Sequence, residues 1–240
     1  MPTVTKDSYF KFLENKGQSG YRAAILVKQA SDQYYSLLVA SETVPSIFGS
    51  QDSFEFDLLN SPAKGKIEGK PSLEEKEVEV LHHRDNVYRF EKLKNKTLDF
   101  LVIDGQFVGY KFVGTLSYRM NDATADVLRG TYTITPMSAD PTPILNARGL
   151  CQETLCFTSV VPDEVKKNEE ITLSVAQAST GVTYTTKLID NNGNEGDDLA
   201  GVIDDNVFKA TSSGLYAITA SLTGYASWTT TVYVNDESAT

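Results

Sequence analysis

The sequence predicts a mainly β protein in two parts, an α+β N-terminal domain and an all-β sandwich at the C-terminus. Short segments rich in β-branched and aromatic residues alternate apolar with polar positions between Gly, Asn, Asp or Ser turns, which is typical of strands. One segment instead repeats apolar residues at every third position, and a proline-rich stretch divides the chain. With 240 residues and 40% hydrophobic content, the chain can form the cores of two modest domains.

The proline-rich stretch is Thr135–Pro143, which contains Pro136, Pro141 and Pro143. Because proline donates no backbone hydrogen bond, we expect an extended connector without regular strand pairing here. The predicted domains are therefore residues 1–150 and 160–240, with a second proline-marked entry at Val161–Asp163.

The C-terminal part has the strand rhythm of an all-β sandwich of under ~100 residues. Its predicted strands are Ile171–Val175, Thr183–Ile189, Val202–Ile203 with Val207–Ala210, Gly214–Ala220 and Trp228–Val234. The last two of these strands resemble the end of bacterial and phage immunoglobulin-like domains. Neither Cys151 nor Cys156 falls on a predicted strand, so the resemblance concerns the architecture and not an antibody-type disulfide.

The N-terminal part mixes strands with helix. Its predicted strands are Tyr21–Lys28, Tyr34–Ala40, Phe54–Leu58, Lys76–Val80, Leu98–Ile103, Phe107–Tyr118 and Thr131–Thr135. Within His83–Lys94, the three-residue spacing of Val87, Phe90 and Leu93 indicates one face of a short amphipathic helix. A second helix is predicted at Asp7–Asn15, which ends before Gly17.

Charge and hydropathy limit the function classes. No segment approaches the ~20 uninterrupted apolar residues that a membrane helix requires, and the first residues lack the pattern of a secretory signal, so we expect no membrane partner. The net charge is −10, and residues 156–240 hold 4 of the 22 Lys and Arg but 12 of the 32 Asp and Glu. Most of the net negative charge therefore belongs to the C-terminal part, where it favours solubility.

Residue patterns for catalysis, metals and cofactors are weak, so we expect no enzyme activity, no metal and no cofactor. Adjacent His82 and His83 diverge on a helix and cannot chelate one metal as an i, i+4 pair does, and they are expected to be exposed at a helix start. Cys151 and Cys156 lack further ligands nearby; they are interpreted as reduced, partly buried thiols, with a local disulfide left open. Asp190–Asp198 lacks the glycine and glutamate positions of a calcium loop and is expected to form a hairpin turn.

The order of segments in the N-terminal part resembles that of the major tail proteins, or tail tube proteins, of tailed bacteriophages. The segments that carry the resemblance are the polar loop Asn60–Ser72, an acidic strand, the short helix, Leu98–Ile103, Gly109–Gly114 and Gly130–Pro136. The resemblance implies a β-sandwich or barrel with a flanking helix that self-assembles into stacked, commonly hexameric rings through which DNA passes. It further implies an immunoglobulin-like domain on the exterior.

The resemblance also implies partners and a location. The partners would be further copies of this chain, other phage tail proteins (tape measure, tail terminator, baseplate or tip) and DNA in transient, non-specific passage. The protein would reside in the virion tail tube, and in the host cytoplasm during assembly. Because the family assembles its tube through the first domain, deletion of residues 160–240 is expected to leave assembly intact.

Two sets of residues are candidates for assembly surfaces. By resemblance to a long hairpin loop that contacts the adjacent ring, Asn60–Ser72 is assigned to ring stacking, although a solvated loop without a partner is the alternative. Its candidate residues are Asn60, Lys64, Lys66, Glu68 and Lys70.

A lumen that DNA crosses without sticking must avoid basic patches. Alternate residues of a strand share a face, so the acidic strands supply candidates for the lumen. They are Glu55, Asp57, Glu75, Glu77 and Glu79. In the alternative interpretation these acids form the solvated face of a sheet, some of them paired with Lys76 or Lys92.

The alternative function is a capsid decoration protein or a module that binds a cell surface or a glycan. In that case Trp228, Tyr225 and Tyr233 are candidates for a sugar-stacking face, whereas aromatic residues close to a strand more often belong to the core.

Overall fold

The computed structural model describes residues 24–39, 53–57, 64–68, 74–103, 107–121, 128–137 and 141–238. It confirms the predicted fold class, since the protein is mainly β, with 51% strand, 8% helical residues and one α-helix in the described part. The helix predicted at Asp7–Asn15 lies outside the described residues.

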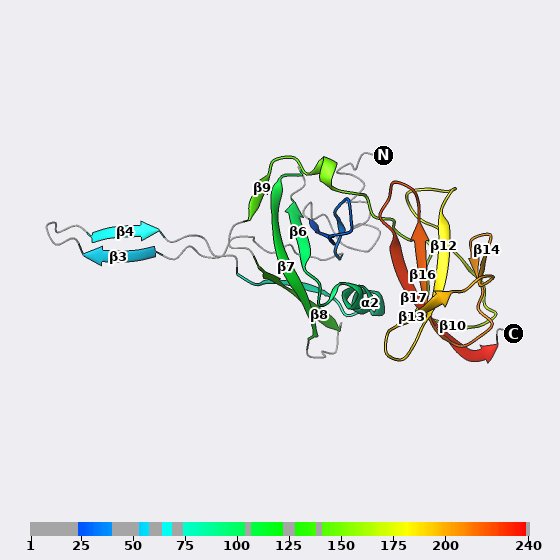
Figure 1. Ribbon diagram of the computed structural model, residues 1–240. Helices are drawn as coiled ribbons and strands as arrows, with labels where there is room; N and C mark the ends of the chain where they lie inside the picture. The colour runs from blue at the N-terminus through cyan, green and yellow to red at the C-terminus, as the bar shows by residue number, and fades with distance from the viewer. Residues whose placement is uncertain are drawn as a thin grey trace.

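An antiparallel sheet of seven strands forms the N-terminal part (Figure 1). Its strands are β1 (Ala24–Lys28), β2 (Ser36–Leu37), β5 (Lys76–Leu81), β6 (Leu98–Ile103), β7 (Gly109–Met120), β8 (Arg129–Pro136) and β9 (Thr142–Ile144). The order is β2-β1-β6-β7-β8-β5, and β9 pairs with β7 beyond the end of β8.

Helix α2 (Arg84–Leu93) covers one face of this sheet, as the three-residue apolar spacing predicts. Leu93 is buried, and Phe90 packs against a cluster of buried side chains that includes Phe100 and Tyr132. Burial alternates along β5, where Lys76, Val78 and Val80 are buried while the residues between them are exposed. The sheet therefore presents its other face near β5 to solvent.

Strands β3 (Ser53–Asp57) and β4 (Lys64–Glu68) form a separate two-stranded antiparallel sheet. Figure 1 shows this hairpin well away from the seven-stranded sheet. The sequence predicted a strand at Phe54–Leu58 but treated Asn60–Ser72 as a loop. That interpretation was wrong for Lys64–Glu68, which is a regular strand.

Two further sheets form the C-terminal part, in agreement with the predicted all-β architecture (Figure 1). The five-stranded sheet consists of β10 (Glu164–Lys167), β17 (Trp228–Ser238), β16 (Gly214–Ser221), β12 (Thr183–Ile189) and β13 (Glu195–Asp198), in this order. The three-stranded sheet consists of β11 (Ile171–Thr172), β15 (Val207–Phe208) and β14 (Ile203–Asp204). Strand β10 runs parallel to β17, whereas the other pairs are antiparallel.

The connector does not have the unpaired, extended form that its prolines predicted. Strand β8 runs through Pro136, and β9 places Pro143 opposite Tyr110 of β7. Among the described strands, β9 has β7 as its one neighbour. A proline on such an edge loses no ladder hydrogen bond when its nitrogen faces away from the neighbouring strand.

A single hydrophobic cluster joins the two parts of the chain. It contains Leu26, Leu37, Leu101, Ile103 and Phe107 from the first part together with side chains from the C-terminal sandwich. The cluster also includes buried residues of the segment that follows β9 and contains the short 3-10 helix η1 (Arg148–Leu150). These are Ala147, Cys151, Leu155, Cys156 and Phe157.

The shared cluster changes one expectation. Removal of residues 160–240 would remove the C-terminal side chains of this cluster, such as Phe208 and Val232, and would leave the apolar side chains that pack against them exposed. Exposure of apolar surface of this kind is unfavourable. A chain that lacks these residues is therefore expected to fold less stably, which bears on the expectation that it still assembles.

Candidate assembly surfaces

The outer edge of β5 is an open sheet edge in the part of the chain that the structure describes. Directly after β5, the His82 amide donates to the Leu128 carbonyl, next to β8, at 3.0 Å. Backbone groups of successive strand residues face opposite sides, so the amide and carbonyl groups of Glu77 and Glu79 face away from β8. No described residue bonds to the backbone groups of these two residues.

The exposed face beside this edge carries three of the predicted lumen acids. Glu75, Glu77 and Glu79 alternate with the buried residues of β5 and are all exposed. Thr135 donates its hydroxyl to Glu75 at 2.9 Å, and Glu77 forms an ion pair with Arg119 at 3.0 Å.

The ion pairs predicted between these acids and Lys76 or Lys92 were wrong. Arg129 lies 3.6 Å from Glu79, Lys92 instead contacts Glu195 at 2.8 Å, and Lys76 is buried on the opposite face. The guanidinium groups of Arg119 and Arg129 make the exposed face mixed in charge rather than acidic. Exposed pairs of this kind contribute only about 0–1 kcal/mol each.

The opposite edge of the seven-stranded sheet is closed by the chain itself. Tyr35, next to β2, donates its amide to the Leu150 carbonyl and accepts the Gln152 amide, both at 2.8 Å. The Leu37 amide donates to the Thr154 hydroxyl at 3.2 Å. Of the two margins of this sheet, the one formed by β5 and β9 is therefore left open by the described residues.

The β3–β4 hairpin combines residues from both predicted sets. Glu55 is opposite Lys66, and Asp57 is opposite Lys64, so acidic and basic positions face each other across the two strands. Ser53 is opposite Glu68, while Asn60 and Lys70 lie outside the described residues. The five predicted lumen acids thus occupy two separate sheets, and the structure does not bring them together.

Helix α2 connects the two parts of the chain through a partly buried carboxylate. Asp85, in the first turn of the helix, is 13% exposed and accepts three hydrogen bonds from β17. The Thr231 amide and hydroxyl each donate to Oδ1 at 2.7 Å, and the Thr230 hydroxyl donates to Oδ2 at 2.9 Å. We call this set the Asp85 latch.

Arg89, one helical turn further along, lies in the same interface. Its guanidinium donates to the backbone carbonyls of Leu37 and Leu38 and lies 4.5 Å from the centre of the Trp228 ring. Burial lowers the pKa of Arg89 to about 10, which leaves the side chain charged at neutral pH. A planar guanidinium can bind two carbonyls and stack on an indole at once.

Glu195 on β13 collects further contacts from α2. It accepts a hydrogen bond from the Tyr88 hydroxyl, and Lys92 and Lys187 approach it to 2.8 and 3.4 Å. Burial, and secondarily the charge of Asp198, raises the pKa of the Glu195 carboxyl. Together with the Asp85 latch, these contacts fix the C-terminal sandwich against the first sheet (Figure 1).

The two histidines are less exposed than predicted, because both are partly buried and bonded. His83 caps α2 by accepting the Asp85 amide, and its Nε2 lies 2.8 Å from Asp163 at the start of the C-terminal part. His82 is hydrogen-bonded through Nδ1 to the Tyr118 hydroxyl at 2.5 Å.

The three aromatic residues proposed for sugar stacking do not form one face. Trp228 is 6% exposed and stacks on Arg89, so it belongs to the interface between the two parts. Tyr233, which is 42% exposed, lies on the other face of β17 because the two positions differ by an odd number. Tyr225 lies in the turn between β16 and β17.

Both cysteine thiols lie inside the protein. Cys151 and Cys156 are buried and form no disulfide with each other, and burial raises the pKa of Cys151 to about 12. Within the described ranges, no three His, Cys, Asp or Glu side chains gather as metal ligands. No helix in the described part has the length and apolar character to cross a membrane.

A comparison with protein-family models and with curated proteins found no match to this chain. The resemblance to tail tube proteins therefore rests on the order of the sequence segments.

The two most informative features were missed by sequence reasoning. The Asp85 latch was missed because nothing local to Asp85 identifies hydroxyl partners on a strand near the C-terminus. The open edge of β5 depends on which strands are neighbours, which alternation along a single strand does not reveal.

Proposed function

We propose that this protein is a structural subunit of a bacteriophage tail tube that associates with copies of itself into stacked rings. The tube is a conduit for DNA, the rings are hexameric, and the chain meets other tail proteins at the ends of the tube and the tape measure within it. The observation that carries the proposal is the open edge of β5.

An open edge is a template for pairing with a second chain. The outward amide and carbonyl groups of Glu77 and Glu79 have no partner among the described residues and could pair with a neighbouring backbone. Edges of this kind are normally blocked or covered in monomeric proteins. When the edge of one copy meets a different surface of the next copy, the contact is heterologous, and a constant rotation per subunit closes a ring.

The β3–β4 hairpin supports the stacking of rings. It stands apart from the body of the protein, as Figure 1 shows, and among the described strands its two members pair only with each other. Isolated two-stranded hairpins are marginally stable in water. Contact with the adjacent ring would supply the missing packing, and the Lys64 and Lys66 positions would make that contact sensitive to charge.

The Asp85 latch and the shared hydrophobic cluster support a fixed exterior domain. The C-terminal sandwich carries most of the net negative charge, and its orientation relative to the ring-forming sheet is set by α2. In a tube, such a domain would point outward at one angle, so each ring would carry a regular array of acidic sandwiches.

Negative-stain electron microscopy of the full-length protein at increasing concentration tests this proposal. We expect hollow rings or tubes of uniform width to appear as the concentration rises. A protein that stays monomeric by light scattering at every concentration, with no rings in the micrographs, would contradict the proposed self-assembly.

A further inference from the structure

A pocket lies on the face of the seven-stranded sheet that α2 does not cover. Its volume is about 300 Å³, which is at the lower end of the range of small-molecule sites. The side chains around it are mostly polar or charged. They include Lys28, Tyr35, Asp99, Lys111, Val113 and Thr142.

The pairing of the strands places these residues next to one another. Lys28 of β1 is opposite Asp99 of β6, which is opposite Val113 of β7. Lys111 lies two residues before Val113 and is opposite Thr142 of β9. Paired residues share a face of a sheet, as do residues two apart on one strand. The pocket is therefore built on one surface by regular sheet structure.

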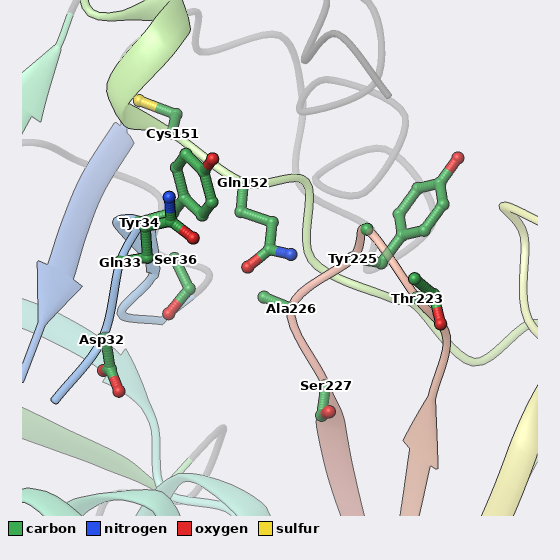
Figure 2. A pocket seen from close by; sticks show the side chains of 11 residues that line it. Asp32, Gln33, Tyr34, Ser36, Cys151, Gln152, Thr223, Tyr225, Ala226 and Ser227 are labelled. Carbon is green, nitrogen blue, oxygen red and sulfur yellow. The ribbon is translucent and has the colours of Figure 1, made fainter. Parts of the chain in front are cut away.

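Tyr35 borders the pocket and is 5% exposed. Its neighbours in the chain, Tyr34 and Ser36, line a different and larger cleft between the two parts of the chain (Figure 2). Successive residues of an extended chain point to opposite sides, so Tyr35 points away from that cleft. It points towards Lys28, whose ammonium group lies 5.1 Å from the centre of the Tyr35 ring.

The hydroxyl of Tyr35 is a hydrogen-bond donor for the pocket. Among the residues that the structure describes, none is hydrogen-bonded to this hydroxyl. Burial, followed by the nearby carboxylate of Asp99 and the thiol of Cys151, raises the pKa of Tyr35 to about 12, so the hydroxyl keeps its proton at neutral pH. A buried hydroxyl without a partner is unfavourable, and an acceptor atom in the pocket would satisfy it.

The charges around the pocket are unbalanced. Two ammonium groups, those of Lys28 and Lys111, stand beside the one carboxylate of Asp99. Lys28 Nζ lies 3.7 Å from Asp99 Oδ2, which is longer than a hydrogen bond. Lys111 is exposed and forms no ion pair with any described residue. The lining side chains thus carry one net positive charge, and both ammonium groups keep donors for a ligand.

These groups together favour a negatively charged ligand that offers several acceptor atoms. An ammonium group donates up to three hydrogen bonds and accepts none, and a protonated tyrosine hydroxyl can donate one. Hydrogen bonds from a charged donor to a charged oxygen are stronger than those between neutral groups. A cation is disfavoured by the net positive charge. A purely apolar ligand would remove the ammonium groups from water without replacing their hydrogen bonds.

We infer that this pocket binds an oxyanion, the carboxylate or phosphate group of a small ligand. Lys28 and Lys111 would balance its charge, and Tyr35 would donate to one of its oxygens. The site goes beyond the proposed role in self-assembly and does not depend on it, because its residues belong to neither β5 nor the β3–β4 hairpin.

Isothermal titration of the full-length protein at constant ionic strength tests the inference with three anions. Inorganic phosphate and acetate represent the two sources of an oxyanion, and chloride carries charge without oxygen atoms. We expect phosphate, acetate or both to bind with a Kd of ~1 mM or tighter, and the tighter of the two identifies the source. Chloride should show no saturable binding. Tyr35→Phe, which removes only the hydroxyl, and Lys111→Gln, which removes the charge, should each weaken binding about fivefold or more.

The matched controls make the same changes outside the pocket. Tyr233→Phe alters a tyrosine that is 42% exposed, and Lys209→Gln alters a lysine that pairs with Glu170 at 2.9 Å. Both should leave the Kd unchanged. If Tyr35→Phe fails to fold, Lys111→Gln decides, because Lys111 is exposed. Absence of binding by both oxyanions at ~10 mM, equal binding of chloride, or unchanged binding in Lys111→Gln or in folded Tyr35→Phe would each overturn the inference.

Discussion

Substitution of Asp85 should destabilise the whole protein, because one carboxylate joins its two parts. In Asp85→Ala, the Thr231 amide and hydroxyl and the Thr230 hydroxyl lose their acceptor, although Thr231 is 1% and Thr230 8% exposed. Hydrogen bonds to charged groups contribute about 1.5–3 kcal/mol each, and buried donors left unpaired add a desolvation cost. Because such terms do not add fully, we expect a loss of roughly 3–5 kcal/mol in the free energy of unfolding.

Two further variants calibrate this value. Asp85→Asn keeps one acceptor oxygen and should lose only about 1–2 kcal/mol. Asp163→Ala removes a carboxylate that also contacts α2, through His83, but is 63% exposed. Its loss should stay below about 1 kcal/mol, as for other exposed ion pairs.

Urea denaturation provides the assay, followed by fluorescence and by far-ultraviolet circular dichroism. Trp228 is the one tryptophan in the chain and lies at the interface beside Arg89, so its fluorescence reports on the contact between the two parts. Circular dichroism reports on the strands of both parts. In the wild type the two transitions should coincide, because the hydrophobic cluster is shared. Separate transitions, or an Asp85→Ala loss no larger than that of Asp163→Ala, would refute this reasoning.

Three other predictions concern the thiols, the domain boundary and the hairpin. Since burial raises the pKa of Cys151 to about 12 and Cys156 is also buried, neither thiol should react with a thiolate-specific reagent at pH ~8 until urea unfolds the chain; fast reaction of the native protein would contradict the structure. A chain ending at residue 160 should fail to melt cooperatively in circular dichroism, because it lacks the β17 partners of Asp85 and Arg89 and the C-terminal side chains of the shared cluster; a wild-type melting curve would show that the first part folds alone. Lys64→Glu combined with Lys66→Glu should leave rings but remove stacked tubes in micrographs, whereas Lys209→Glu, on the C-terminal sandwich, should leave both; intact tubes in the hairpin variant would exclude the hairpin from stacking.

The sequence predicted well which segments form strands or a helix and which of their residues face the core, because both depend on the spacing of neighbouring residues. Strands β6 and β12 have the predicted bounds, and α2 follows from the spacing of Val87, Phe90 and Leu93. Strand β4 was missed since its sequence, Lys-Gly-Lys-Ile-Glu, offers a single large apolar residue and one glycine. Such a segment becomes a strand through its partner β3 rather than through its own propensity.

The candidate surfaces could be predicted only in part. Alternation correctly placed Glu75, Glu77 and Glu79 on one face, yet it could not show that Arg119 and Arg129 lie beside two of them. The partners of Asp85 are 145 and 146 residues away along the chain. Contacts of this range depend on how the sheets are ordered and packed, which single-sequence patterns do not determine.

The β5 edge is tested most directly by two substitutions at one position. Glu77→Pro removes the outward amide, which no described strand uses, and Glu77→Ala keeps it; both lose the ion pair with Arg119. Because the amide faces away from β8, the proline should not break a ladder bond within the subunit. Circular dichroism and urea denaturation should first show that both variants remain folded.

Sedimentation velocity across a concentration series then measures assembly of both variants against the wild type. If neighbouring copies pair along β5, Glu77→Ala assembles like the wild type, while folded Glu77→Pro stays monomeric at concentrations at least tenfold higher. Rings formed equally by both variants would show that subunits associate without this edge.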